Sequence, residues 1–334
     1  MDEPTHVPVL LDEVRALLQP ERGGTFVDCT VGLAGHARML LEGGASRLIG
    51  FDRDTDALAI ARQVLAPFGD RVTLVHADYR ELERVLDAQG VSSVAGVLAD
   101  FGVSSMQLDA DGRGFSFRRD EPLDMRMDRT TGETAAELID RVDETELADA
   151  IYQFGEERRS RQVARAIVAA RQHGRIETTG RLAEIVRRAV AARTWQRIDP
   201  ATRTFQALRI WVNRELDGLD RYIGSAVARL QPAVESGVGD TAAGGRIALI
   251  AFHSLEDRVV KHTFRAMSRP SAVWSPPMTV APLMLMVYAT GAGADVDALG
   301  CMEAGSSGVS RPRGPRPPPP PRPPPALMPA TAAY

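Results

Sequence analysis

The chain has 334 residues, which is long enough for one large domain or for one domain with an inserted second unit. Hydrophobic residues make up 44% and charged residues 25%, a composition typical of a globular protein. No run of about 18 apolar residues is present, and the acidic start lacks the features of a secretory signal, so we predict a cytoplasmic protein. The two cysteines, Cys29 and Cys301, are too few for a zinc site, and we predict no bound metal.

The net charge of −4 is unusual for a nucleic-acid-binding protein, but the charge is unevenly distributed. Residues 151–214 contain fourteen arginines and five acidic residues, a local charge of +9. Such a segment can contact phosphate groups. For the helical pattern at 158–172, a solvated face of an amphipathic helix is an equally good interpretation.

Five short apolar segments end in polar or glycine-containing turns. We predict strands at 25–28, 47–52, 72–78, 94–100 and 246–252. Helical patterns follow the first three of them, at 37–41, 57–65 and 82–86. This alternation predicts an α/β fold with a parallel sheet covered on both faces, whose ligands bind at the carboxyl ends of the strands. Four of the strands end in, or directly precede, an aspartate: Asp28, Asp52, Asp78 and Asp100.

More than a hundred residues separate the fourth and fifth predicted strands, and their patterns are helical, at 135–139, 146–154, 158–172 and 182–192. Because one crossover helix cannot use so much chain, we predict an inserted helical domain at 108–207. The sheet domain would then consist of 1–107 and 208–270. Fourteen of the 22 prolines lie in 271–334, so we predict a largely disordered proline-rich tail there.

The loop 28–36 between the first strand and its helix is rich in small residues, which let a backbone approach a ligand. Asp52 can accept hydrogen bonds from both ribose hydroxyls of an adenosyl group, and Tyr79 can stack beside an adenine ring. Together these features predict a nucleoside cofactor. The loop lacks the G-x-G-x-x-G spacing of dinucleotide-binding proteins, but a nicotinamide-dependent oxidoreductase stays an alternative.

Longer and less common motifs occupy 98–109, 113–117, 122–128, 201–213 and 252–258. In these motifs the chain closely resembles the bacterial 16S ribosomal RNA cytosine-N4 methyltransferases (the RsmH or MraW family), from His6 to about Lys261. The resemblance implies a class I, Rossmann-like methyltransferase sheet with an inserted helical domain, and S-adenosylmethionine as the cofactor. It further implies N4-methylation of a cytidine in the decoding region of 16S rRNA, within the small ribosomal subunit.

The resemblance also places the family's cofactor contacts on this sequence, at Ala34, Gly35, His36, Asp52, Tyr79, Asp100 and Gln107. Two of these positions depart from the family's usual residues. Ala34 stands where glycine is usual, which we expect to add a methyl group close to the cofactor, and Tyr79 stands where phenylalanine is common.

Two residues are candidates for catalysis. The amino lone pair of cytosine is delocalised into the ring, so acceptors for the amino hydrogens would favour its attack on the methyl group. Asp100 stands where amino-methyltransferases place this acceptor, with cofactor binding as the alternative role. His253 follows the fifth strand and would border the site, with a structural hydrogen bond as the alternative.

Contacts with RNA are predicted at two places. Four aromatic side chains are candidates to hold the flipped base, with core packing as the alternative for each: Phe101, Phe115, Phe117 and Trp211. Phe115 and Phe117 are favoured because they lie on a polar loop. Phosphate contacts are predicted for Arg158, Arg161 and Arg165. The family's usual C-terminal N-P-R-S-R-S-type motif is absent, so a catalytically impaired RNA-binding or assembly factor with the same fold is a further alternative.

Overall fold

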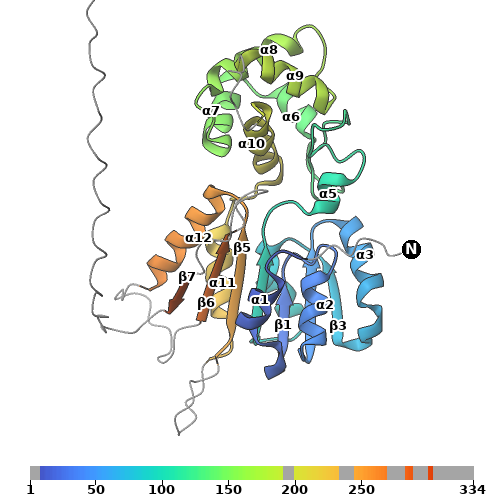
Figure 1. The fold of residues 1–334 in the computed structure, drawn as a ribbon, viewed down its shortest axis with the longest axis vertical. Helices are drawn as coiled ribbons and strands as arrows, with labels where there is room; N and C mark the ends of the chain where they lie inside the picture. The colour runs from blue at the N-terminus through green and yellow to red at the C-terminus, as the bar shows by residue number, and fades with distance from the viewer. Residues whose placement is uncertain (1–7, 191–198, 233–243, 269–282, 289–299, 304–334) are drawn as a thin grey trace, which may run out of the picture.

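The computed structural model describes residues 8–190, 199–232, 244–268, 283–288 and 300–303. Figure 1 shows a sheet flanked by helices and, beyond one end of its strands, a separate group of helices. Among the described residues, no helix is long and apolar enough to cross a membrane.

In the described part of the chain the sheet has seven strands, in the order β3-β2-β1-β4-β5-β6-β7. Their bounds are β1 Thr25–Asp28, β2 Arg47–Asp52, β3 Val72–His76, β4 Gly96–Asp100, β5 Arg246–Ala251, β6 Leu283–Tyr288 and β7 Gly300–Glu303. Neighbouring strands are parallel from β3 to β6, and β6 pairs with β7 antiparallel. The strand order reverses between β1 and β4, which is where open α/β sheets bind their ligands.

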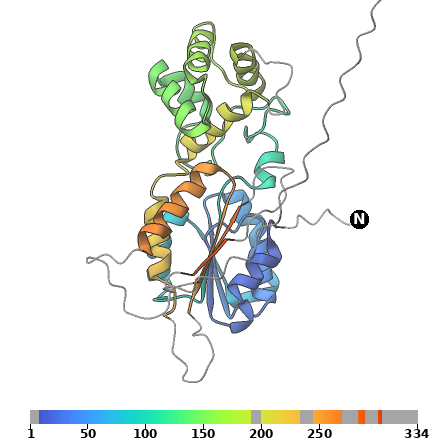
Figure 2. The same cartoon turned by 60° about the vertical axis from the view of Figure 1, so that its left-hand side comes forward.

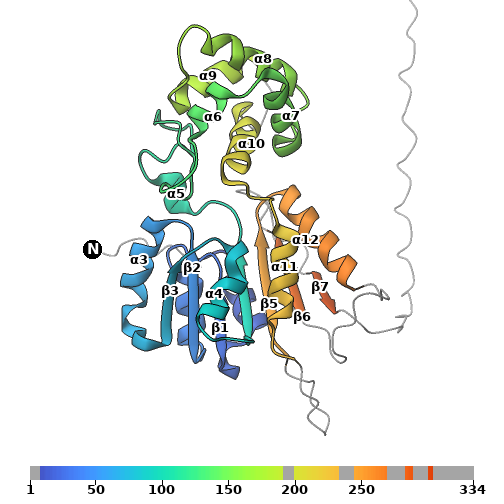
Figure 3. The ribbon, with the colours of Figure 1, turned by 180° about the vertical axis from the view of Figure 1, so that it is seen from behind.

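Helices cover both faces of the sheet, because successive side chains of each strand point to opposite sides. Thus Phe26 packs in the core beneath the helices α1 Leu11–Leu18, α2 Gly35–Glu42 and α3 Thr55–Leu65. Its neighbour Val27 packs beneath α4 Leu82–Ala88, α11 Leu219–Ala228 and α12 Ser254–Met267. Figures 1 and 3 show these two layers from opposite sides, and Figure 2 shows the sheet between them. Short 3-10 helices lie at Pro20–Arg22, Ala66–Arg71 and Tyr79–Glu81.

The group of helices beyond the sheet has a hydrophobic core of its own. After the short helix α5 Ser105–Asp109, the group consists of α6 Ala135–Arg141, α7 Glu144–Gly155, α8 Ser160–Arg171, α9 Thr179–Val190 and α10 Ala201–Asn213. Thr134 caps α6 and Asp143 caps α7, each by accepting a hydrogen bond from a backbone N–H of the first turn. Side chains such as Ile151, Val163 and Leu182 are fully buried between these helices. We call α6–α10 the helical group.

The structure confirms the predicted α/β class and differs from the predicted boundaries in two places. The helix α10 runs without a break across the predicted boundary at 207. Two strands, β6 and β7, lie within the tail predicted to be disordered, and β6 extends the sheet beside β5. The proline count of the whole tail hides the apolar sequence at 283–288, which contains no proline. The rest of the predicted tail lies outside the described residues.

Candidate active site

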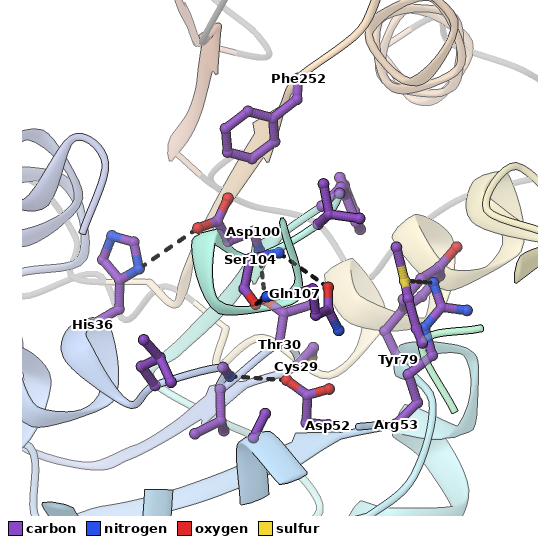
Figure 4. A pocket seen from close by; sticks show the side chains of 18 of the residues that line it. Cys29, Thr30, His36, Asp52, Arg53, Tyr79, Asp100, Ser104, Gln107 and Phe252 are labelled. Carbon is purple, nitrogen blue, oxygen red and sulfur yellow. Dashed lines mark hydrogen bonds and ion pairs between the residues drawn. The ribbon is translucent and has the colours of Figure 1, made fainter. Parts of the chain in front are cut away.

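A pocket of about 300 Å³ opens at the carboxyl ends of the strands, where the strand order reverses. Its walls come from the loops after β1, β2, β3 and β4 and from the ends of α10 and β5. Six of the seven predicted cofactor contacts line it: Gly35, His36, Asp52, Tyr79, Asp100 and Gln107. Figure 4 shows most of these side chains around the pocket.

The seventh predicted contact, Ala34, does not line the pocket. Its side chain is fully buried in the core beneath α1 and α2, so its methyl group points away from the cofactor site. Ala34 takes the left-handed conformation with φ 65°, in which glycine carries no steric cost. The expectation of a methyl group close to the cofactor is therefore wrong, and the departure from glycine acts on the backbone instead.

Gly35 follows at the start of α2 and has no room for a side chain. A Cβ atom on Gly35 would lie 2.2 Å from Cγ of Pro8, which also lines the pocket. This close approach packs Pro8, a residue of the pocket wall, against the first turn of α2. The backbone N–H groups of this turn have no hydrogen-bond partner within the helix.

Asp52 is held at the pocket wall by two backbone hydrogen bonds. Its Oδ2 accepts from the N–H of Gly32 at 2.8 Å, and its Oδ1 accepts from the N–H of Asp54 at 2.9 Å. Burial raises the pKa of Asp52, although these two bonds counteract the effect. Each carboxylate oxygen keeps a further lone pair, so the group can still accept hydrogen bonds from two ribose hydroxyls.

Tyr79 lies in the 3-10 helix after β3, and its ring lines the pocket together with Phe101, at a centroid distance of 5.5 Å. Its hydroxyl donates to the carbonyl oxygen of Glu215 at 2.8 Å, just beyond the end of α10. The tyrosine thus adds a bond between the sheet and the helical group that phenylalanine could not make.

Asp100 ends β4 in a buried and acidic part of the pocket. Its Oδ2 lies 4.0 Å from Nδ1 of His36, and its Oδ1 is buried without a hydrogen-bond partner among the described residues. Burial, together with the charges of Asp28 and Glu256, raises the pKa of Asp100 to about 8. Burial likewise raises the pKa of Asp28 to about 7. A cationic group such as an ammonium would satisfy this orphaned carboxylate, so the site fits the methionine end of S-adenosylmethionine.

Gln107 is fixed by contacts on both sides of its carboxamide. Its Oε1 accepts from the N–H of Ser104 at 3.1 Å, and its Nε2 donates to Oδ2 of Asp54 at 2.7 Å. One amide hydrogen therefore stays available for a ligand in the pocket.

Arg113 forms a buried ion pair that sequence reasoning does not predict. Its side chain is 3% exposed, and its Nη2 lies 2.7 Å from Oδ2 of Asp54, whose side chain is 2% exposed. Arg113 also donates to the carbonyl oxygens of Arg126 and Met127. The motif at 113–117 marks the segment as unusual, but its partner Asp54 lies 59 residues earlier, so no local signal reveals the pair.

His253 lies behind the pocket wall and does not line it. Its Nδ1 accepts from the N–H of Glu256 at 3.3 Å, which caps α12, and its Nε2 lies 3.1 Å from Oε1 of Glu256 and 3.9 Å from Oε2 of Glu215. Burial lowers the pKa of His253, but the two nearby glutamates outweigh this and raise it. The structural alternative agrees with this position, and a direct catalytic contact does not.

Glu215, His253 and Glu256 lie close enough together to hold a metal ion. Because Nδ1 of His253 accepts a backbone hydrogen bond, its proton lies on Nε2, which then has no lone pair for a metal. Glu215 is also held by Arg209 through bonds of 3.0 and 2.9 Å. The cluster is therefore better explained as an ion-pair network that joins the end of α10 to β5.

Phe115 and Phe117 do not line the pocket. Phe115 is buried in the core of the helical group, and Phe117 packs edge-on against Phe205 at a centroid distance of 4.8 Å. Their placement agrees with core packing, and the contact with the target base stays a prediction. The aromatic rings that line the pocket beside Tyr79 are Phe101 and Phe252.

The arginines predicted to contact phosphate are exposed around α8. Arg161 lies 3.4 Å from Asp149, and Arg165 lies 3.5 Å from Glu144, while Arg158 precedes the helix. Figure 1 places α8 at the end of the helical group away from the sheet. The structure therefore does not bring these arginines to the pocket, and their role in RNA binding stays a prediction.

A parallel sheet with Asp52 and Tyr79 at one side of the pocket and Asp100 at the other defines a class of enzymes that use a nucleoside cofactor. Residues 3–285 match the MraW methylase family, and the chain belongs to that family. The match continues past Lys261 and ends within the strand β6.

Two curated relatives cover most of the chain. A protein of Sorangium cellulosum is 54% identical over 271 residues, which are 81% of this chain and 81% of the relative. A protein of Nitrobacter winogradskyi is 52% identical over 257 residues, 77% of this chain and 74% of the relative. Both are named ribosomal RNA small subunit methyltransferase H. The predicted family and methyltransferase class are thus confirmed, and S-adenosylmethionine as the cofactor is confirmed with them.

Proposed function

We propose that this chain transfers a methyl group from S-adenosylmethionine to the N4 amino group of a cytidine in the decoding region of 16S rRNA, within the small ribosomal subunit. The names of its relatives support methylation of small-subunit rRNA. The observation that carries the proposal is the pocket itself, with a ribose-binding carboxylate at Asp52 and an orphaned carboxylate oxygen at Asp100.

Bound S-adenosylmethionine would supply an electrophilic methyl group on its sulfonium. Asp52 accepts hydrogen bonds from the ribose, Tyr79 contacts the adenine, and the wall formed by Phe101 excludes water. The methyl–sulfur bond would break as the cytosine nitrogen gains the methyl group, leaving S-adenosylhomocysteine, and the nitrogen would release one proton to solvent. Alignment of this nitrogen with the methyl group contributes more to the rate than any single base.

Asp100 can serve in two ways, as acceptor for the ammonium of the cofactor or for the amino hydrogens of cytosine. The substitution Asp100→Asn separates them. If it lowers turnover while the affinity for S-adenosylmethionine is kept, Asp100 acts on cytosine. If both fall together, Asp100 binds the cofactor.

The helical group is our candidate for RNA recognition, since it lies beyond the carboxyl ends of the strands, where the pocket opens, and contains most of the arginine-rich segment 151–214. This assignment keeps the predicted division into a sheet domain and an inserted domain, with the inserted part ending within α10.

The proposed function is tested by incubating the protein with labelled S-adenosylmethionine and small ribosomal subunits that lack the modification. We expect transfer to assembled subunits and little transfer to deproteinised 16S rRNA. Cofactor binding without any transfer would favour the impaired assembly factor, and binding of a nicotinamide cofactor in place of S-adenosylmethionine, measured by calorimetry, would favour the oxidoreductase.

A further inference from the structure

A second hollow of about 640 Å³ lies beside the cofactor pocket, between the ends of β2 and β3 and the helices α6 and α10. We call it the side groove and define it by six of its lining residues: Arg53, His76, Arg126, Arg141, Trp211 and Arg214. Of these residues, the sequence suggests a role only for Trp211, as one of the candidates to hold the target base.

The side groove adjoins the cofactor pocket. Arg53 and Asp78 line both hollows, and they form an ion pair with an Nη1–Oδ2 distance of 3.5 Å. Nη1 of Arg53 also donates to the carbonyl oxygen of Asn213 at 2.9 Å, at the end of α10. A chain lying in the groove would therefore lead directly to the wall of the pocket.

The charges in the groove are mixed, and most of them are paired. Arg53 and Arg80 bind Asp78, and Arg141 binds Glu133 at 2.7 Å. Arg126 binds Asp124 at 2.7 Å in the same way. Glu81, Asp128 and His76 also face the groove, and His76 lies 3.6 Å from Asp128.

Arg214 differs from the other arginines of the groove. It is exposed, and its side chain has no hydrogen bond or ion pair with the part of the chain that the structure describes. It ends α10 in the left-handed conformation, with φ 49°. Trp211 is half-buried three residues earlier, and both residues line the side groove.

A partly exposed indole beside an uncompensated arginine suits single-stranded RNA, whose bases stack on aromatic rings and whose phosphates bind arginine. We propose that the side groove binds rRNA nucleotides adjacent to the target cytidine, with Trp211 stacking on a base and Arg214 contacting a phosphate. This inference rests on the proposed function, which makes small-subunit rRNA the substrate.

The test measures binding of unmodified small ribosomal subunits to Arg214→Gln and Trp211→Leu. Arg265→Gln is the matched control for charge, because Arg265 is exposed in the last turns of α12, at the end away from the pocket. Trp211→Phe is the control for packing, because it keeps an aromatic ring. Cofactor affinity is measured for every variant, since a misfolded protein would lose it.

We expect Arg214→Gln to weaken subunit binding about 3- to 10-fold and to reduce the slope of log K against log salt by about 1. Trp211→Leu should weaken binding about 5-fold or more, and Trp211→Phe much less. Arg265→Gln should bind subunits like the parent, and all four variants should keep their affinity for S-adenosylmethionine.

Equal subunit binding by the parent and Arg214→Gln would overturn the inference. Photocrosslinks from the groove to a ribosomal protein instead of rRNA would also overturn it. If Trp211→Leu also loses affinity for S-adenosylmethionine, that variant is misfolded, and Arg214→Gln alone tests the inference. Failure of the parent to methylate subunits would refute the proposed function, whereas the binding measurement needs no methyl transfer and tests the groove separately.

Discussion

At the scale of single residues, the loop after β1 requires small side chains for two different reasons. Ala34 tolerates a left-handed backbone, which costs a residue with a Cβ atom about 1–2 kcal/mol relative to the right-handed form. Gly35 has an ordinary conformation but no space, because Pro8 lies where its side chain would be. Position 34 therefore needs a small side chain because of its backbone conformation, and position 35 needs one because the pocket wall is close.

Gly35→Ala should weaken S-adenosylmethionine binding, because either Pro8 or the first turn of α2 must move to relieve a 2.2 Å contact. Calorimetric titration measures the effect, which we expect to be at least about 10-fold, equal to about 1.4 kcal/mol. Gly224→Ala is the matched control: nothing lies within 4 Å of a Cβ atom at this helical glycine. Unchanged cofactor affinity in Gly35→Ala would contradict this account of the wall.

The raised pKa of Asp100, about 8, predicts a pH dependence of cofactor binding. Below this pH the free protein holds a proton on Asp100, which an ammonium ligand must displace, so affinity should rise as the pH rises toward 8. Titrations in a pH series from about 6 to 9 measure this rise. Asp100→Asn should show a flat profile, and an equally steep profile in that variant would assign the titration to another group.

The same raised pKa has the opposite effect on the stability of the cofactor-free protein, which should decrease as the pH rises. An unfolded aspartate titrates near pH 4, whereas Asp28 and Asp100 titrate at about 7 and about 8 in the folded protein. The folded state thus binds more protons in this window, so its free energy of unfolding falls as the pH rises from about 4 to 8. Urea unfolding at two pH values checks the direction, and a smaller fall is expected in Asp100→Asn.

The strand-end residues of the site could be predicted because carboxyl ends of parallel strands meet at one edge. Asp52, Tyr79 and Asp100 all line the pocket for this reason. Glu215 and Arg113 could not be predicted, because their partners are remote in sequence and depend on how the helical group sits above the sheet. Ala34 was placed correctly in the loop but with the wrong orientation, because its left-handed backbone turns the side chain into the core.

At the scale of secondary structure elements, Asp54 has two roles that a substitution can separate. It caps α3 by accepting from the N–H of Asp56 at 3.0 Å, and it neutralises the buried Arg113. Asp54→Ser keeps a capping oxygen but removes the buried anion of Arg113 and leaves only the exposed Asp56, at 3.1 Å, as its partner. We therefore expect a loss of about 1–3 kcal/mol in the free energy of unfolding. Urea denaturation measures the loss.

The exposed cap Asp143 provides the control for this prediction. It also accepts from a backbone N–H, at 2.8 Å to Glu146, but it has no buried arginine partner. Asp143→Ser should cost less than about 1 kcal/mol. Similar losses for the two serine variants would mean that the Arg113 pair contributes little.

The helix α8 carries the second prediction at this scale. Reversing the charges of Arg158, Arg161 and Arg165 to glutamate should weaken binding of small subunits and leave the affinity for S-adenosylmethionine unchanged. The ion pairs of Arg161 and Arg165 with acidic residues of α7 are exposed and worth at most about 1 kcal/mol each, so folding should survive. Subunit sedimentation assays measure the effect, and undiminished binding would remove α8 from the RNA-binding surface.

The helices of the helical group were predicted to within a few residues where apolar side chains recur at helical spacing, as in α7, α8 and α9. The strand β6 was missed because the composition of the tail was averaged over 271–334, and prolines dominate that average. The parallel pairing of β6 with β5 could not be predicted from local composition, because β5 is distant in the sequence.

At the scale of the whole molecule, the sheet and the helical group have separate cores but are joined by polar contacts around the pocket. Arg113 binds Asp54, the hydroxyl of Tyr79 binds Glu215, and Arg53 binds the end of α10. All three contacts adjoin residues of the cofactor pocket. Under the proposed function, RNA on the helical group and cofactor on the sheet would therefore act on the same set of bonds.

The central claim is that this pocket directs a methyl group to the N4 amino group of a cytidine. It is tested most directly by digesting small-subunit rRNA after reaction with labelled S-adenosylmethionine and identifying the labelled nucleoside by chromatography and mass spectrometry. We predict that the label is found in N4-methylcytidine, at one site in each subunit. Label in a different nucleoside, or on a ribose hydroxyl, would contradict the claim.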